Sequence, residues 1–215
     1  MPETTKGMKS IGPKALLSLN SKYTVLDKQI LAIKSINRRN KIFISTGFQH
    51  SKVLKIANKY RNVQIINEKN YEKYNQCKHI INYIEHISEL EDVFIINNGI
   101  LFKDNCFDRL TKNNPSTIYI IDKNKEDFEL GCQSQDSQYL FYGLPRKWTE
   151  CIFLNKSLMQ KILEMHKSQD ISNYFLFEII NMIYDNHEIN ESIVSYKNIM
   201  KINNCEDIRR AKRFL

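Results

Sequence analysis

The residues of this chain that are best placed for chemistry lie in the stretch EDVFIINNGILFKD, residues 91–104. The apolar, β-branched run 93–96 predicts a short buried strand. It ends at Asn97, Asn98 and Gly99, and a second apolar run follows at once. Asn-Gly between two apolar runs favours a tight hairpin turn, but the carboxyl end of a buried strand is also where α/β proteins bind ligands. The stretch is therefore either a turn or the edge of a ligand site.

Two other kinds of chemistry find no support in the residue pattern. The five histidines lie in helical patterns without a glycine-flanked serine or cysteine, which argues against a nucleophilic triad. The cysteines form no C-x-x-C pair and have no histidine at metal-ligand spacing, which argues against zinc and against a disulfide framework. We expect reduced, mostly buried thiols at Cys77, Cys106, Cys132, Cys151 and Cys205.

The composition predicts one globular domain spanning residues 1–215, since 42% of the residues are hydrophobic and 11% aromatic. The net charge of +8 suits polyanions such as nucleotides, nucleic acid and phosphorylated metabolites. The lysines are spread along the chain, however, and the basic stretches SINRRNKIF and DIRRAKRF each flank a helix end, where cations complement the helix dipole. We interpret the charge as a solvated surface and do not expect nucleic acid as a partner.

No apolar run approaches the roughly 20 residues needed to cross a bilayer. The N-terminal stretch MPETTKGMKS has no signal-peptide core. We expect a soluble, cytoplasmic protein with no membrane partner.

Apolar periodicity predicts strands that alternate with helices in the first half of the chain. Such alternation implies right-handed crossovers and a mostly parallel sheet covered on both faces. The second half is less regular, and the whole predicts an α/β fold of three layers, α/β/α, with a Rossmann-like sheet. The predicted strands are 41–45, 63–66, 93–96, 117–121, 139–142, 151–154 and one that opens at 193; the predicted helices are 26–36, 53–60, 74–87, 156–166, 173–186 and 206–214.

Four segments, in order, resemble the nucleotidyltransferases of the GT-A-like fold. These enzymes attach a nucleoside monophosphate to a sugar phosphate or to an alcohol phosphate such as phosphocholine. The segments are GPKALLSLNSKYTVLDKQI (12–30), NEKNYEKYNQCKHI (67–80), VFIINNGILF (93–102) and IMKINNCEDIRRAKRFL (199–215). The resemblance spans nearly the whole chain.

The resemblance implies ligand-binding roles in the first two segments. Gly12 and Lys14 match the family's proline-lysine stretch, so Lys14 is a candidate catalytic residue that touches a phosphate or the phosphorylated acceptor. Tyr71, Tyr74 and Asn75 match the wall of the base or acceptor pocket. A helix N-terminus that packs on the core is the alternative interpretation of the two tyrosines.

The resemblance also points to the sequence YGLPRKWTE in the second half. In the family the corresponding region helps to form the acceptor pocket, which makes Trp148 and Arg146 candidates for its lining. We expect Trp148 to pack at the rim of the second half.

The departures from the family pattern fall on its metal ligands, because these enzymes hold Mg²⁺ with two aspartates. Alignment places Asn98 at the family's glycine, Gly99 at the first aspartate and Asn203 at the second. Mg²⁺ prefers carboxylate oxygens and would lose two negative ligands, so we assign no metal-binding residue. Asp104 is the one carboxylate that we expect to be able to substitute, as a second candidate catalytic residue.

The start of the chain also departs from the family, which opens with an apolar strand and a glycine-rich phosphate loop. The stretch MPETTKGMKSIGPK has neither, although Gly7 and Lys9 match the end of the loop, and either Lys6 or Lys9 lies near the position of the family's phosphate-binding arginine. The first strand lies in the middle of the sheet in this fold, so its loss would expose the hydrogen-bonding groups of two strands. Either the neighbours close up, or another segment, a second copy or a partner chain fills the slot, or the strand has been lost from this sequence.

The resemblance and its departures favour a protein that descends from these transferases and has lost most or all catalysis. It would bind a nucleoside triphosphate, an NDP-sugar or a phosphorylated small molecule as a binding or assembly module. One alternative is an active Mg²⁺-dependent transferase that makes an NDP-sugar or a CDP-alcohol. A second alternative is a basic nucleic-acid-binding protein.

Overall fold

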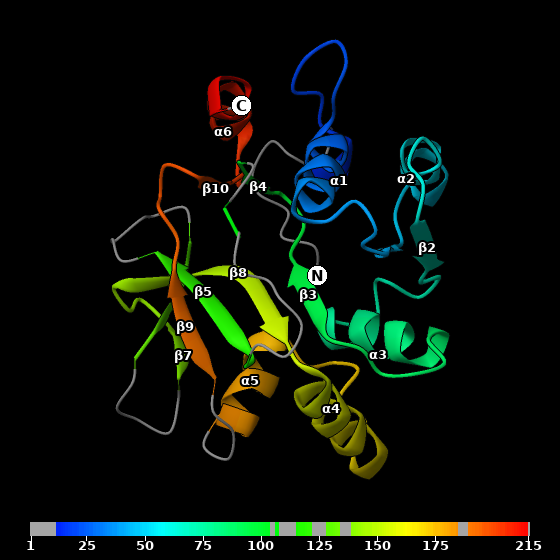
Figure 1. Ribbon diagram of the computed structural model, residues 1–215, viewed down its shortest axis with the longest axis vertical. Coiled ribbons are helices and arrows are strands. Elements are labelled where there is room, and N and C mark those ends of the chain that lie inside the picture. Colours follow the sequence, from blue (N-terminus) through cyan, green and yellow to red (C-terminus); the bar gives the residue numbers. More distant parts are fainter. Residues whose placement is uncertain are drawn as a thin grey trace. The chain divides into compact units, whose positions relative to one another are not determined.

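The computed structural model describes residues 12–103, 106–107, 115–121, 128–133, 139–184 and 189–214. The chain divides into two compact units that interleave in the sequence. Unit 1 comprises residues 1–72, 98–108 and 197–215, and unit 2 comprises residues 73–97 and 109–196. Figure 1 labels most of the helices and strands of both units. A single domain over residues 1–215 stays a prediction.

The described residues of unit 1 form one parallel and one antiparallel pair of strands. β1 and β2 pair in parallel from Ile42 opposite Val63 to Thr46 opposite Asn67, so their carboxyl ends lie side by side. β4 and β10 are antiparallel. The elements are η1 (Lys14–Leu16), α1 (Val25–Ile36), β1 (Ile42–Thr46), α2 (His50–Ala57), β2 (Val63–Asn67), β4 (Ile100–Phe102), β10 (Ile199–Lys201) and α6 (Cys205–Phe214).

Helix α1 begins with a capping box. The Thr24 side chain accepts a hydrogen bond from the Asp27 N–H, and the Asp27 carboxylate accepts from the Thr24 N–H at 2.8 Å. Asp27 is buried and also accepts a hydrogen bond from the Tyr60 hydroxyl at 2.7 Å. Burial alone would raise the pKa of Asp27, but the hydrogen bonds from Thr24 and Tyr60 and the charge of Lys59 outweigh it and lower the pKa. Asp27 is therefore ionised, and its carboxylate joins the start of α1 to Tyr60.

Among the described residues, two apolar clusters contribute to the interior of unit 1. In the first, Leu26 and Ile30 of α1 pack with Ile42 of β1 and with Val53 and Ile56 of α2. The second cluster lies around β4 and β10 and includes Leu17, Val25, Leu101, Met200, Ile202 and Ala211. This second cluster joins three segments that are far apart in the sequence.

Unit 2 is built on one six-stranded sheet of order β7-β6-β8-β5-β9, with β3 also paired to β8. Among the described residues, β1–β2 and β5–β9 are parallel pairs and the other pairs are antiparallel, with β8 antiparallel to β3, β5 and β6. The elements are α3 (Gln76–His86), β3 (Val93–Ile96), β5 (Thr117–Ile121), β6 (Leu130–Cys132), β7 (Leu140–Tyr142), β8 (Arg146–Leu154), α4 (Lys156–Ser168), α5 (Leu176–Tyr184) and β9 (Asn190–Ile193).

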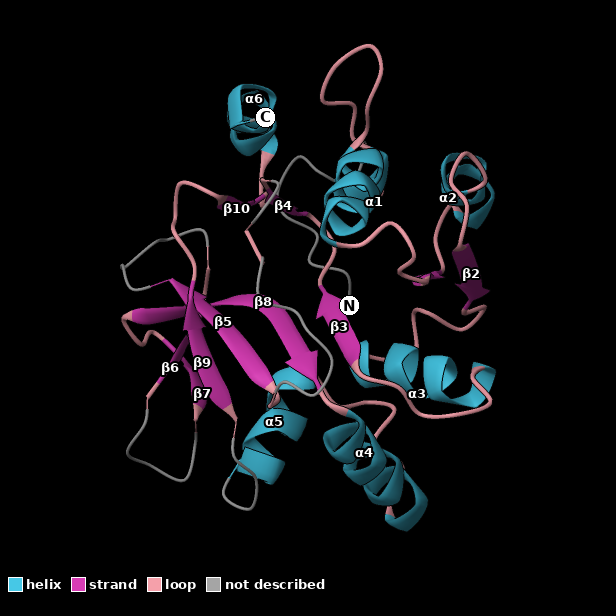
Figure 2. Cartoon of the chain, viewed as in Figure 1, coloured by secondary structure: helices cyan, strands magenta, loops and turns pink. Residues whose placement is uncertain are grey.

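Helices α3, α4 and α5 contribute to the core of unit 2 together with one face of its sheet, and Figure 2 shows α4 and α5 beside the strands. Ile118 and Ile120 of β5 and Ile152 of β8 alternate toward this core, as expected for strands with one face on helices. At the edge strand β7, the Asn181 side chain accepts from the Leu140 N–H at 2.8 Å and donates to its carbonyl at 2.9 Å. Asn181 therefore occupies backbone groups of β7 that would otherwise be open to another strand.

The α/β class is confirmed, as are the strands at 41–45, 63–66 and 93–96 and the closing helix. The strand predicted to open at 193 is wrong in its bounds, because β9 spans Asn190–Ile193 and ends there. Strand β8 starts at Arg146 and not near 151, because a bulge interrupts its apolar pattern. The prediction that Trp148 packs at the rim is wrong: it is 3% exposed in the core, where its indole N–H donates to the Cys151 carbonyl. A buried indole needs such a partner.

Cys77, Cys132 and Cys151 are buried, which confirms the prediction that most of the thiols are buried. The missing first strand was predicted for residues that lie outside the described part of the chain. Within the described part, no helix has the length and apolar character needed to span a membrane.

Candidate functional site

The Asn98-Gly99 corner is not the loop of a β-hairpin. Strand β3, which precedes it, pairs with β8, and strand β4, which follows it, pairs with β10. Asn98 is exposed, whereas Gly99 is buried with a φ of +83°, a left-handed conformation that favours glycine. Of the two interpretations of this stretch, the hairpin is therefore wrong.

Gly99 lies directly under Lys14. A Cβ added at Gly99 would lie 2.7 Å from Cδ of Lys14, 3.6 Å from Cβ of Lys14 and 3.4 Å from the carbonyl oxygen of Ile202. The Ile202 N–H donates to the Gly99 carbonyl at 2.9 Å. Glycine is needed here for its φ and for its lack of a side chain, because the lysine stem occupies the space that an aspartate would fill.

Asn203 follows Ile202 directly and so lies at the same corner. Its N–H donates to Oδ2 of Asp207 at 2.8 Å, and Oδ1 of Asp207 accepts from Arg210 at 2.9 Å. The Asn204 side chain accepts from the Asp207 N–H at 3.1 Å, which completes the start of α6. The Asp207 carboxylate, four residues after Asn203, is therefore engaged in capping α6.

The residues at this corner do not fit a magnesium site. Gly99 has no side chain, Asn203 offers a neutral amide and Lys14 places a cationic side chain over the glycine. Mg²⁺ takes oxygen ligands and is usually held by one or two carboxylates. Within the described ranges, no three His, Cys, Asp or Glu side chains form a group that could hold a metal ion.

Polar side chains also gather at the carboxyl ends of β1 and β2. Oγ1 of Thr46 lies 2.7 Å from Nδ1 of His50. Gln49 begins α2 in a left-handed conformation, with φ of 56°, and a Cβ at Gly12 would lie 3.2 Å from its Nε2. Gly12, next to Pro13 and Lys14, thus connects these strand ends to the Gly99 corner.

Tyr71 covers the end of β1. A Cβ at Gly47 would lie 2.2 Å from Cγ of Tyr71, so the ring rests directly on the glycine. Partial burial and the charge of Glu72 raise the pKa of Tyr71, which keeps the phenol protonated and able to donate a hydrogen bond. The tyrosine forms a wall at the strand ends, where ligands bind in α/β folds.

Tyr74 and Asn75 belong to unit 2, at the start of α3. Asn75 is the residue before the helix, and its Nδ2 donates to the Asn173 carbonyl at 2.6 Å. The Asn75 N–H donates to the Ser172 carbonyl at 3.2 Å. Lys78 lies over the Tyr74 ring at 5.7 Å. Asn75 therefore ties α3 to the loop before α5.

Glu150 is a residue that the sequence did not single out. It has a φ of 59° in the middle of β8, where three residues of β8 lie opposite Tyr119 of β5. This bulge turns the Glu150 side chain toward the end of β3, where it accepts from Nδ2 of Asn97 at 2.6 Å. A glutamate in a strand carries no local signal for such a conformation.

Arg146, the other candidate of β8, forms an ion pair with Glu191 of β9. Oε1 of Glu191 accepts from the buried Tyr139 hydroxyl at 2.6 Å. Burial, the neighbouring Cys132 thiol and Glu191 raise the pKa of Tyr139. Arg146 thus belongs to a hydrogen-bonded group that stabilises the sheet, and Trp148 lies in the core.

The structure brings Gly12, Lys14, Gly99 and Asn203 to one corner of unit 1, and it places Tyr71 at the strand ends of the same unit. Lys9 and Asp104 lie outside the described residues. The sequence analysis did not single out Gln49 and His50. The polar stretch STGFQH at the end of a predicted strand could have indicated them. The roles of these residues stay predictions.

The parallel strands with helical crossovers and the polar strand ends define a nucleotidyltransferase-like α/β fold. Solved structures with this fold include the CTP:phosphocholine cytidylyltransferase of Streptococcus pneumoniae, which is 17% identical with a TM-score of 0.74, over 94% of this chain and 89% of that chain. The inositol-1-phosphate CTP transferase of T. maritima is 8% identical with a TM-score of 0.69, over 94% of this chain and 86% of that chain.

The nucleoside-diphosphate-sugar pyrophosphorylase of Vibrio cholerae RC9 is similar as well, at 8% identity and a TM-score of 0.72 over 94% of this chain and 91% of that chain. No family model and no curated protein matches the sequence. The resemblance to sugar-phosphate and alcohol-phosphate nucleotidyltransferases is confirmed at the level of the fold.

Proposed function

We propose that this protein binds a nucleotide or a phosphorylated small molecule at the Lys14–Gly99 corner and that it has lost the transfer reaction of its structural relatives. The observation that carries the proposal is the position of the Lys14 stem, 2.7 Å from where a Cβ of residue 99 would lie. Gly99 offers no carboxylate, and the Lys14 side chain lies over it. The corner therefore carries an ammonium group and no metal-binding carboxylate where we expect the related enzymes to hold Mg²⁺.

One ammonium group supports binding better than it supports catalysis. Nucleotidyl transfer crowds the oxygens of three phosphates and of the attacking group around one phosphorus, and the enzyme must neutralise the charge that develops there. A lysine supplies a single charge on a flexible stem. A bound nucleotide gains a charge-assisted hydrogen bond from Lys14, while in-line transfer lacks the divalent ion that would hold attacker and leaving group together.

Calorimetric titration with CTP, UTP, ATP and CDP-choline tests the binding. We expect binding that EDTA does not abolish, because the cation is part of the chain. Lys14→Met should weaken it by about 10-fold or more, since a hydrogen bond to a charged group contributes roughly 1.5–3 kcal/mol. Lys52→Met, on the exposed side of α2, is the matched control and should bind as the native chain does. Equal affinity in the two variants contradicts the assignment of Lys14.

Pyrophosphate release tests the loss of transfer. We expect no release above the enzyme-free blank with Mg²⁺, each triphosphate, and phosphocholine or a sugar 1-phosphate as acceptor. Robust release that collapses in Asp104→Asn would overturn the proposal and establish the alternative, an active Mg²⁺-dependent transferase that makes an NDP-sugar or a CDP-alcohol.

A further inference from the structure

The charge of the chain is divided between its two units. The segments of unit 1 together carry 21 Lys and Arg against 8 Asp and Glu, a net charge of +13, whereas those of unit 2 carry 11 against 16, a net charge of −5. In the linear sequence this division is hidden, because unit 1 is assembled from three separate segments. The excess positive charge thus lies on one unit and is not diffuse.

Four of the basic side chains of unit 1 line an open pocket of about 430 Å³, which we term the basic pocket. Lys34 and Arg38 project from the last turn of α1 and beyond it, and Lys59 and Arg61 come from the connection between α2 and β2. Two further lining residues, Leu31 and Tyr60, are apolar or aromatic.

The basic pocket is separate from the Lys14–Gly99 corner. Arg61 precedes β2 and Arg38 precedes β1, so both lie toward the amino ends of these parallel strands. Gln49 and Tyr71 follow the same strands at their carboxyl ends. Because parallel strands run in one direction, the two groups of residues lie at opposite ends of the pair.

The cations of the basic pocket are largely unneutralised. Among the described residues, Lys34, Arg38 and Arg61 have no carboxylate within salt-bridge distance. Lys59 lies 3.6 Å from Oδ1 of Asp27, but that oxygen also accepts the Tyr60 hydroxyl. Like charges gathered without acidic partners repel one another, and a bound polyanion relieves this repulsion.

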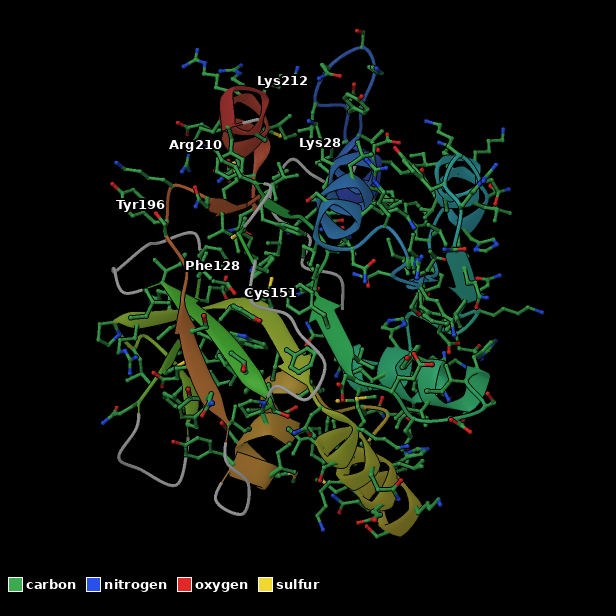
Figure 3. The ribbon with its side chains drawn as sticks, viewed as in Figure 1. Lys28, Phe128, Cys151, Tyr196, Arg210 and Lys212 are labelled. Atoms are coloured by element: carbon green, nitrogen blue, oxygen red, sulfur yellow. The ribbon has the colours of Figure 1, made fainter. Side chains whose placement is uncertain are left out.

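The outer face of α6 adds a second group of cations on the same unit. Arg209, Arg210 and Arg213 line a pocket of about 360 Å³ there, and Figure 3 shows the side chains of this helix with Arg210 and Lys212 labelled. The apolar face of α6 packs inside the unit through Ala211. It is therefore not available for insertion into a lipid surface, which separates this helix from a membrane-binding amphipathic helix.

We propose that the basic pocket binds the phosphate backbone of single-stranded nucleic acid. Tyr60 lines the pocket among the cations and favours nucleic acid over a plain phosphate chain, because bases stack on aromatic rings whereas polyphosphate has no ring to stack. The Tyr60 hydroxyl is anchored on Asp27, which holds its ring in place. The open shape fits a chain that passes over the surface.

Fluorescence anisotropy with labelled single-stranded RNA and DNA of roughly 12 nucleotides, a length in the range that such grooves hold, tests the proposal on the full chain. We expect binding at about 50 mM salt that weakens steeply as salt rises. Arg38→Gln combined with Arg61→Gln should weaken it by about 10-fold and lower the salt slope by about 1.4, since each lost phosphate contact on a single strand removes about 0.7. Thermal unfolding checks that the double variant is folded.

The matched control is Lys161→Gln combined with Lys167→Gln, two exposed lysines of α4 in unit 2. It removes the same charge and should change the affinity by less than about 2-fold. Absence of binding at low salt, an equal loss in the control, equal affinity for a polyphosphate of matched charge, or displacement of the oligonucleotide by CTP would each overturn the proposal. Binding that persists with CTP present supports a site distinct from the nucleotide site.

Discussion

Replacing Gly99 by alanine probes the contact with Lys14 on which the candidate site depends. Two costs add in Gly99→Ala. An alanine at a φ of +83° costs roughly 1–2 kcal/mol in backbone strain. Its Cβ would also lie 2.7 Å from Cδ of Lys14, so the lysine must leave its rotamer, at a further cost of about 1 kcal/mol. We expect a total loss of about 2–3 kcal/mol in the free energy of unfolding.

Gly143 offers a matched control for the strain alone. It has a φ of +81° and nothing within 4 Å of an added Cβ, so Gly143→Ala should cost roughly 1–2 kcal/mol. In a Lys14→Ala background the close contact with Cδ is gone and only an ordinary contact with Cβ at 3.6 Å remains, so Gly99→Ala should then cost about as much as Gly143→Ala. Urea unfolding of the four-member cycle measures this coupling, expected near 1 kcal/mol. A coupling of zero would refute the placement of Lys14 over the glycine.

Three further predictions concern stability and reactivity. Asp27→Asn should cost roughly 2–3 kcal/mol in the free energy of unfolding, because charged hydrogen bonds are lost. Since folding lowers the pKa of Asp27, its ionised carboxylate stabilises the fold above the unfolded pKa of about 3.9, and this stabilisation is lost as pH falls through the lower folded pKa. Urea unfolding at several pH values should show that the variant lacks this acid dependence. Ellman's reagent should react first with the exposed Cys205 and slowly with Cys77, whose pKa burial raises to about 12, and Cys205→Ser should remove the fast phase. Asn181→Ala should cost about 2 kcal/mol, because the buried Leu140 backbone loses both partners, and light scattering should detect association through the opened strand edge.

Elements with strong local periodicity were predictable from the sequence. The helix over 26–36 and the strands at 42–46 and 63–67 follow from apolar spacing that one segment displays by itself. The three-residue strands β4 and β10 were not predicted, because runs this short have no period, and their pairing depends on segments distant in the chain. The same is true of the left-handed Glu150, whose conformation follows from the register of β8.

The candidate site was predictable in part. Alignment to a family pattern located Lys14, Gly99 and Asn203 without any knowledge of their distances, and the structure brings all three to one corner. Trp148 was misplaced because a lone tryptophan after a turn gives no signal of burial. The concentration of positive charge was missed for a physical reason, since net charge along the chain says nothing about how separate segments are grouped in space.

The interleaving of the two units has a consequence for how the protein is made on the ribosome. Unit 2 has all its strands once residue 196 has emerged, but β4 must wait for β10, which is synthesised after it. Until then Leu101, which is 1% exposed in the finished protein, stays uncovered on the nascent chain. Non-local pairing of this kind slows folding and exposes apolar surface to chaperones. The Lys14–Gly99 corner is thus assembled last, and a prematurely terminated chain would carry the acidic unit 2 without it.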